Sequence, residues 1–132
     1  MTENFDRTHP AGAVKYFRHC IATGNLDGAL SCFDQEAIYI ERDGEEITGP
    51  ENIKKPLEHL CNWKPDIQGN KQKLTIVGDL AVWVDQWMLK AFSPDGTPIE
   101  MKGATTCMMK KNEEGIWLWL VDNPFAGQIF ED

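Results

Sequence analysis

The residues of this sequence best suited to chemistry are carboxylates that alternate with aromatic side chains. Residues 83–87 read WVDQW, so one residue separates Asp85 from Trp83 on one side and from Trp87 on the other. Side chains of a β-strand point alternately to its two faces, which places these three on one face. If that face lines a pocket, Asp85 is desolvated and suited to general acid–base catalysis. A structural ion pair, or hydrogen bonds to the backbone, is the alternative role.

Two more carboxylates lie near predicted strand ends. Glu41 shares a strand face with Tyr39 and is a second candidate base; the alternative is an exposed carboxylate beside the charged turn at 42–46. Tyr39 could donate a hydrogen bond at a pocket rim or be an ordinary core residue. Asp122, with Asn123, could anchor a ligand or merely end a strand.

Three helices are predicted ahead of most of the strands that carry these residues. Apolar residues recur at helical spacing from Pro10 to a stop at Gly24, and again over 26–33 with Asn25 as N-cap. A third helix begins near Thr48 with capping-box spacing, and Pro56 should end or kink it. An early hairpin pairs 37–41 with 45–48.

After residue 65 the pattern changes to the period of two that is typical of strands. Turn sequences separate four predicted strands, at about 68–77, 80–92, 99–110 and 116–122. A five-residue turn at 93–97 would place Trp87 opposite Gly103, Asp85 opposite Thr105 and Trp83 opposite Cys107. A two-residue turn would shift the register and exchange the two faces.

The predicted architecture is α+β, a cone in which three N-terminal helices pack on a strongly curved mixed or antiparallel sheet. The outer face of that sheet would carry exposed apolar side chains, and we expect a homodimer through it. The residues concerned are Val82, Val84, Met88, Thr106 and Met108.

Length and composition limit the classes of function. The 132 residues suit one domain, expected over 10–127, with a flexible segment at 1–9 and a tail at 128–132. A net charge of −8 disfavours nucleic acid as a partner. The sequence shows no membrane span or signal peptide, and its four cysteines are scattered, so we expect a cytoplasmic protein with free thiols. The three histidines have no metal-binding spacing, and no metal or cofactor is expected.

Four local strings resemble the nuclear-transport-factor-2-like superfamily, and within it the SnoaL-like and ketosteroid-isomerase-like branch. They are GNLDGAL at 24–30, FDQEAIY at 33–39, TGPENI at 48–53 and GIWLWLVDNPFAG at 115–127. The resemblance implies a cone with an apolar pocket at its open end, and it turns Leu118, Leu120 and Asp122 inward. The base of the isomerase members corresponds to Glu41, but their helix Tyr and late Asp correspond to Phe17 and Cys107. The ketosteroid isomerase reaction itself is therefore not expected.

The resulting functional hypothesis is a pocket for a small apolar or aromatic molecule, with Asp85 and Glu41 as acid–base candidates in cofactor-free isomerase, dehydratase or cyclase chemistry. The alternative is a non-catalytic association module whose interior is filled by its own side chains. The expected ligand-binding residues are Tyr39, Trp83, Trp87, Met101, Thr105, Cys107, Trp119, Leu120 and Asp122.

Overall fold

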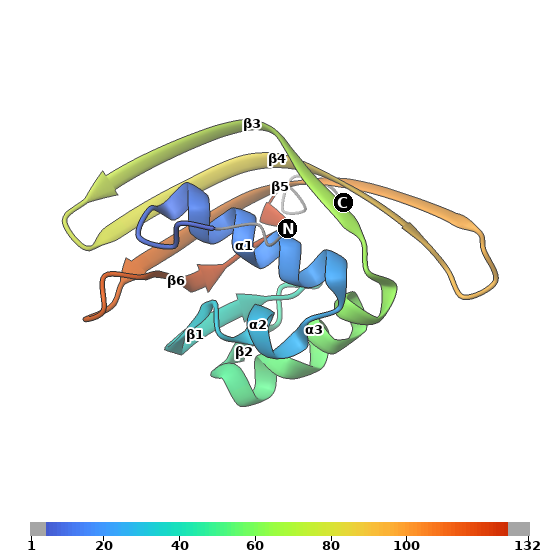
Figure 1. Cartoon of the computed structure of the whole chain (residues 1–132), viewed down its shortest axis with the longest axis horizontal. Coiled ribbons are helices and arrows are strands. Elements are labelled where there is room, and N and C mark those ends of the chain that lie inside the picture. Colours follow the sequence, from blue (N-terminus) through green and yellow to red (C-terminus); the bar gives the residue numbers. More distant parts are fainter. Residues whose placement is uncertain (1–4, 127–132) are drawn as a thin grey trace.

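Three helices and six strands make up the computed structural model, which describes residues 5–126 (Figure 1). No helix in this range is long and apolar enough to span a membrane. The helices are α1 (Pro10–Thr23), α2 (Leu26–Leu30) and α3 (Pro50–Trp63). The strands are β1 (Phe33–Ile40), β2 (Glu46–Thr48), β3 (Asp66–Val77), β4 (Leu80–Phe92), β5 (Pro98–Lys111) and β6 (Trp117–Asp122).

Most of the predicted helix signals act as expected. Helix α1 has a proline in its first turn and ends at Gly24, whose φ of 73° suits glycine. The Asn25 side chain accepts a hydrogen bond from the backbone N–H of Gly28 and caps α2. The capping box at Thr48 was wrong, because α3 starts from Gly49 without a side-chain cap. Pro56 does not end α3, which continues to Trp63.

The sheet is mixed, with strand order β2-β1-β6-β5-β4-β3. Only the β1–β6 pair among the described strands is parallel. In the β4–β5 hairpin Asp85 lies opposite Thr105 and Trp87 opposite Gly103, which confirms the predicted register. A Cβ atom on Gly103 would lie 2.5 Å from Cζ2 of Trp87, so glycine is needed for the indole to cross the strand there.

The long strands β3, β4 and β5 arch over the helices, as Figure 1 shows. On β4 the side chains alternate between buried and exposed along the whole strand, so its concave face forms part of the core. Fully buried side chains of the helices, such as Ile21, Ile53 and Leu57, complete this core. Burying each contributes roughly 1.5–3 kcal/mol. The predicted α+β cone with three helices is confirmed.

Strand β6 departs from the predicted face pattern because it contains a bulge. Val121 pairs with Met108 and Trp119 with Met109, so Leu120 is an extra residue between them. The bulge brings Trp119 and Asp122 to the same buried side and leaves Leu120 half-buried. The expectation that Leu118 and Leu120 point inward with Asp122 was therefore wrong.

Part of the N-terminal segment is in contact with the domain. The backbone N–H of Trp117 donates a hydrogen bond to the carbonyl of Arg7 at 3.0 Å. The Arg7 guanidinium lies 4.6 Å from the ring centre of Tyr16, and the Phe5 ring packs edge-on against the same ring. The first four residues, the domain boundary at 127 and the predicted tail at 128–132 lie outside the described residues.

Candidate functional site

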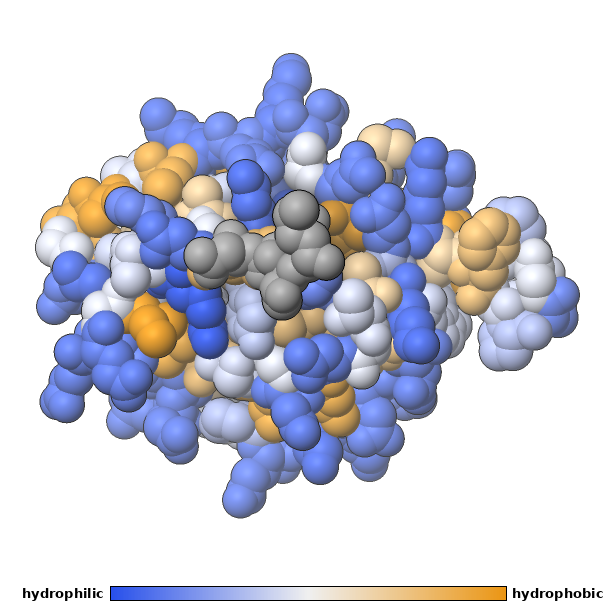
Figure 2. All heavy atoms as spheres, viewed as in Figure 1, coloured by the Kyte–Doolittle hydropathy of each residue, from blue (hydrophilic) through white to orange (hydrophobic). Residues whose placement is uncertain are grey.

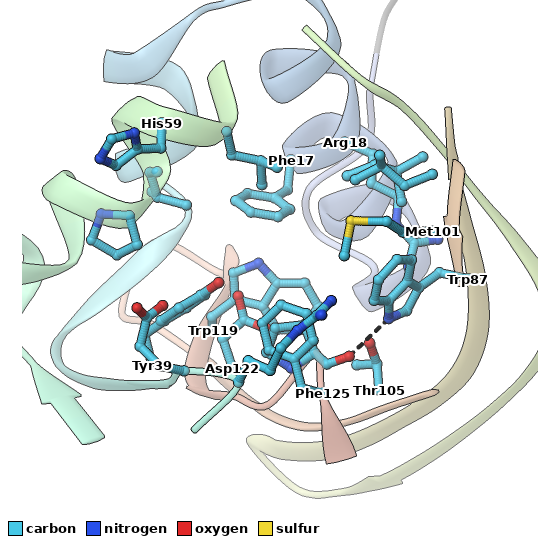
Figure 3. A pocket seen from close by; sticks show the side chains of 18 of the residues that line it. Phe17, Arg18, Tyr39, His59, Trp87, Met101, Thr105, Trp119, Asp122 and Phe125 are labelled. Carbon is cyan, nitrogen blue, oxygen red and sulfur yellow. Dashed lines mark hydrogen bonds between the residues drawn. The ribbon is translucent and has the colours of Figure 1, made fainter. Parts of the chain in front are cut away.

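A cavity of about 360 Å³ lies between the helices and the concave face of the sheet. Figure 3 shows His59 and Tyr39 at one end of it, and Arg18, Met101 and Trp87 at the other. The lining is mainly aromatic and apolar, with a few ionisable groups, as is usual for small-molecule sites. The lining residues are Phe17, Arg18, Tyr39, Glu41, Arg42, Pro56, Leu57, His59, Leu60, Trp63, Ile67, Trp87, Leu89, Met101, Thr105, Trp119, Asp122, Pro124 and Phe125.

Asp122 is the most unusual ionisable group on this lining. It ends β6, lies beside Tyr39 of β1, and is only 5% exposed. Burial raises its pKa from 3.8 to about 6, with a smaller contribution from Asp85; a hydrogen bond from Cys107 and the charge of Arg18 oppose the rise. The Sγ of Cys107 donates that bond to Oδ1 at 3.3 Å. A carboxyl with this pKa can accept or donate a proton near neutral pH.

Tyr39 lies in β1 and Glu41 lies just after its end, two residues further along the chain. Both side chains line the cavity. Burial, chiefly, raises the pKa of the Tyr39 hydroxyl well above its ordinary value, so the hydroxyl remains protonated and can donate a hydrogen bond. The pKa of Glu41 is also raised, first by burial and then by Asp43 and Glu45, while His59 opposes the rise. The site thus contains two carboxyls and a neutral phenol.

Asp85 lies behind the cavity wall and is absent from the described lining. Its Oδ2 accepts a hydrogen bond of 2.6 Å from Nη2 of Arg18, in an ion pair where the Asp85 side chain is fully buried. Asp85 therefore forms the structural ion pair that was the alternative to a catalytic role. Its partner Arg18 lines the cavity, whereas Asp85 does not. Because Arg18 occupies Oδ2 of Asp85 and Asp85 does not line the cavity, this carboxylate is poorly placed to take a proton from a ligand.

The cavity brings together seven of the residues predicted from the sequence: Glu41, Tyr39, Trp87, Met101, Thr105, Trp119 and Asp122. Within the described lining, Trp83, Asp85, Cys107 and Leu120 are missing. Trp83 and Cys107 are buried in the main core, and the bulge in β6 removes Leu120. The pKa of the Cys107 thiol is raised well above its ordinary value by burial and by Asp122, which makes it a poor nucleophile.

Several lining residues were missed by the sequence analysis. Arg18 follows Phe17 on α1, but nothing local signals its partner on β4. Phe125 packs edge-on against Trp87 and lies 5.0 Å beneath the Arg42 guanidinium. Nε1 of Trp87 donates a hydrogen bond to the carbonyl of Pro124 at 2.9 Å (Figure 3). This bond holds the segment after β6 against the cavity, where Pro124 and Phe125 are part of the lining. Residues 123–126 were part of a string that resembles the superfamily, but the sequence did not predict that they line the cavity.

Among residues 5–126, no group of three His, Cys, Asp or Glu side chains is placed to hold a metal ion.

Comparison with known proteins places the fold. No family model and no curated protein matches the sequence. Among solved structures, a candidate calcium/calmodulin dependent protein kinase II association domain from Xanthomonas campestris is similar, with a TM-score of 0.78 and 18% identity over 86% of this chain and 81% of that one. A nuclear transport factor 2 (NTF2-like) superfamily protein from Salmonella enterica has a TM-score of 0.74 and 15% identity over 84% and 83%.

A ketosteroid isomerase-like protein from Shewanella frigidimarina is also similar, with a TM-score of 0.67 and 17% identity over 83% of this chain and 89% of that one. Identities this low carry information about architecture, whereas chemistry has to be argued from the site. The expected resemblance is confirmed at the level of architecture, and the chain has the NTF2-like fold.

Proposed function

We propose that this protein binds a compact apolar or aromatic molecule in the cavity and transfers a proton to or from it, with Asp122 as the acid–base group. The observation that carries the proposal is a fully buried carboxyl, with a pKa of about 6, on the wall of an aromatic cavity. Acid–base catalysis is most efficient when the pKa of the group lies near the working pH.

The other polar groups of the lining have roles consistent with this chemistry. The Tyr39 hydroxyl, which stays protonated, can donate a hydrogen bond to a ligand oxygen beside Asp122. Glu41 is the second carboxyl of the lining and the candidate to return the proton at another position. Two carboxyls with raised pKa beside a neutral phenol fit isomerase, dehydratase or cyclase chemistry, in which protons are added to and removed from the ligand.

Hydrogen–deuterium exchange tests the proposal without knowledge of the substrate. In D₂O, 2-tetralone loses its acidic α-protons when a base removes one and a deuteron is returned to the carbon. We expect the protein to accelerate this loss, measured by ¹H NMR, and Asp122→Asn to reduce the acceleration by about 100-fold or more. Asp79→Asn, the same change at an exposed turn, should have no effect.

Binding of 2-tetralone, measured by tryptophan fluorescence, separates the two parts of the proposal. Trp63, Trp87 and Trp119 line the cavity and should report its occupation. Binding without accelerated exchange would overturn the catalytic part and leave a binding protein. No binding would overturn both parts.

The alternative is an association module, and one of the similar structures carries a name of that kind. The outer face of the sheet is the relevant surface, because Val82, Val84 and Met88 on β4 are each at least 40% exposed. Figure 2 shows further apolar surface at the two ends of the molecule, over the β3–β4 and β4–β5 hairpins. We propose that a second copy of this chain covers the outer face, since monomers rarely expose such patches.

Sedimentation tests this self-association. The wild type should be a dimer at micromolar concentration, and Val84→Lys at the middle of the face should be a monomer. Val77→Lys, the same change at the exposed β3–β4 hairpin, should leave the dimer intact. A monomeric wild type would contradict the proposal.

We also propose that the protein works in the cytoplasm. All four cysteines lie within the described residues and are free, buried thiols, which is the usual state in a reducing compartment. A tagged chain found in a secreted or periplasmic fraction would contradict this.

A further inference from the structure

Arg18 is the one strongly basic group on the inner part of the cavity lining, and the proposed function does not use it. It projects from α1 toward the end of the cavity that contains Trp87 and Met101 (Figure 3). Its side chain is 16% exposed, while its partner Asp85 is completely buried. The guanidinium is therefore bound to the wall on one side and open to the cavity on the other.

The ion pair leaves hydrogen-bonding capacity unused. A guanidinium has five N–H donors in a planar fork, and Nη2 of Arg18 makes its one described bond, to Oδ2 of Asp85. The other oxygen of Asp85, Oδ1, is buried and has no partner among the described residues. The pair is thus single rather than bidentate, and the remaining N–H groups of Arg18 are available to a ligand.

The sheet leaves room for this pair at a bulge in β3. A Cβ atom on Gly69 would lie 2.3 Å from Nε2 of Gln72 and 3.0 Å from both Nη1 of Arg18 and Oδ2 of Asp85. The pairing of β3 with β4 shifts immediately after Gly69. Glycine at the bulge therefore allows the guanidinium and the carboxylate to occupy one fixed position.

The charges around the cavity favour a neutral ligand over an anion. Asp85 pairs with Arg18, and in the formal charge count of the lining Glu41 offsets Arg42. With histidine counted as neutral, ionised Asp122 leaves the site negative, as is the whole chain at −8. An anion would gain little from an arginine that is already neutralised, whereas a carbonyl oxygen can still accept its hydrogen bond.

We propose that Arg18 selects ligands that carry a neutral carbonyl oxygen, and that Asp85 is a positioning residue that holds the guanidinium and cancels its charge. This inference rests on the proposed function, because it assigns the polar group of the same ligand. It places a carbonyl at the Arg18 end of the cavity, separate from the ligand oxygen that Tyr39 could bind at the other end. It also gives Asp85 a role without contact to the ligand.

Three probes of nearly the same shape test the inference: 2-acetylnaphthalene, 2-isopropenylnaphthalene and 2-naphthoate. The first carries the carbonyl, the second replaces its oxygen by a methylene group, and the third carries an anion. From tryptophan quenching we expect the wild type to bind the ketone roughly 10-fold more tightly than the alkene, and the naphthoate no better than the alkene.

Asp85→Asn keeps the shape of the side chain and removes its charge. The affinity for the ketone should fall toward that for the alkene, because Arg18 is held less firmly, while the affinity for naphthoate should rise by roughly 10-fold. A purely structural role would change all three affinities in the same direction.

The outcomes separate this inference from the proposed function. Equal binding of ketone and alkene to the wild type overturns the role of Arg18 and leaves the cavity as a binding site. A uniform shift of all three probes in Asp85→Asn overturns the positioning role of Asp85. Failure of all three probes to bind the wild type overturns the proposed function and this inference with it.

Discussion

Asp85 and Asp122 are both buried carboxyls on the inner side of one sheet, yet their surroundings differ. Asp85 forms a 2.6 Å ion pair with Arg18 behind the cavity wall. Asp122 lines the cavity and receives a weak hydrogen bond from a thiol instead of a paired cation. Its pKa rises to about 6, mainly through burial. Both groups are buried, so burial alone does not distinguish them; they differ in their partners, a guanidinium for Asp85 and a thiol for Asp122.

Loss of the Arg18 cation beside Asp85 should have the largest effect on the free energy of unfolding among the changes considered. Arg18→Met leaves a fully buried carboxylate without a partner and should lower the free energy of unfolding by about 3–5 kcal/mol, measured by urea denaturation. The double variant Arg18→Met/Asp85→Leu removes both charges and should recover most of the loss. A cost below about 1 kcal/mol for Arg18→Met would contradict the prediction and mean that the pair adds little to stability.

The sequence predicted the fold better than it predicted the site, for a physical reason. Alternation along β4 and the five-residue turn at 93–97 are local features, and they determine the register that places Asp85 opposite Thr105. Helix ends at Gly24 and Asn25 are equally local. The bulge at Leu120 is visible only when β6 is paired with β5, so the inward face of β6 was predicted wrongly.

The distinction between the two carboxyls depended on contacts between distant parts of the chain. Asp85 between two tryptophans was the more conspicuous pattern, but its partner Arg18 lies 67 residues away on α1. Asp122 at a strand end carried no comparable signal, and its neighbours Cys107 and Tyr39 come from two other strands. The residue types identified the two candidate carboxyls, but the partner of each became visible only in the tertiary structure.

The pH dependence of stability should sharpen the comparison from the Asp122 side. Its pKa is 3.8 ordinarily and about 6 in the folded protein, so the folded state binds the proton more tightly. The contribution of Asp122 to the free energy of unfolding therefore falls as the pH rises from about 4 to about 6, and it is constant at higher pH. The difference between the two pKa values corresponds to about 3 kcal/mol.

Asp122→Asn removes the titrating carboxyl, so it isolates the contribution of Asp122 to the pH dependence of stability. Its free energy of unfolding, relative to that of the wild type, should increase by about 3 kcal/mol between pH 4 and pH 7. Asp79→Asn at the exposed turn should show a nearly constant difference from the wild type. A flat difference for Asp122→Asn would mean that Asp122 has an ordinary pKa and would contradict the prediction.

The smallest change acts on Asp122 through its thiol neighbour. The hydrogen bond from Cys107 lowers the pKa of Asp122, so Cys107→Ala should raise that pKa above about 6 and move the loss of stability to higher pH. The overall cost should be about 1 kcal/mol, typical of a small buried deletion. A carboxyl ¹³C titration of Asp122 measures the shift directly, and a fall in the pKa would contradict the assigned bond.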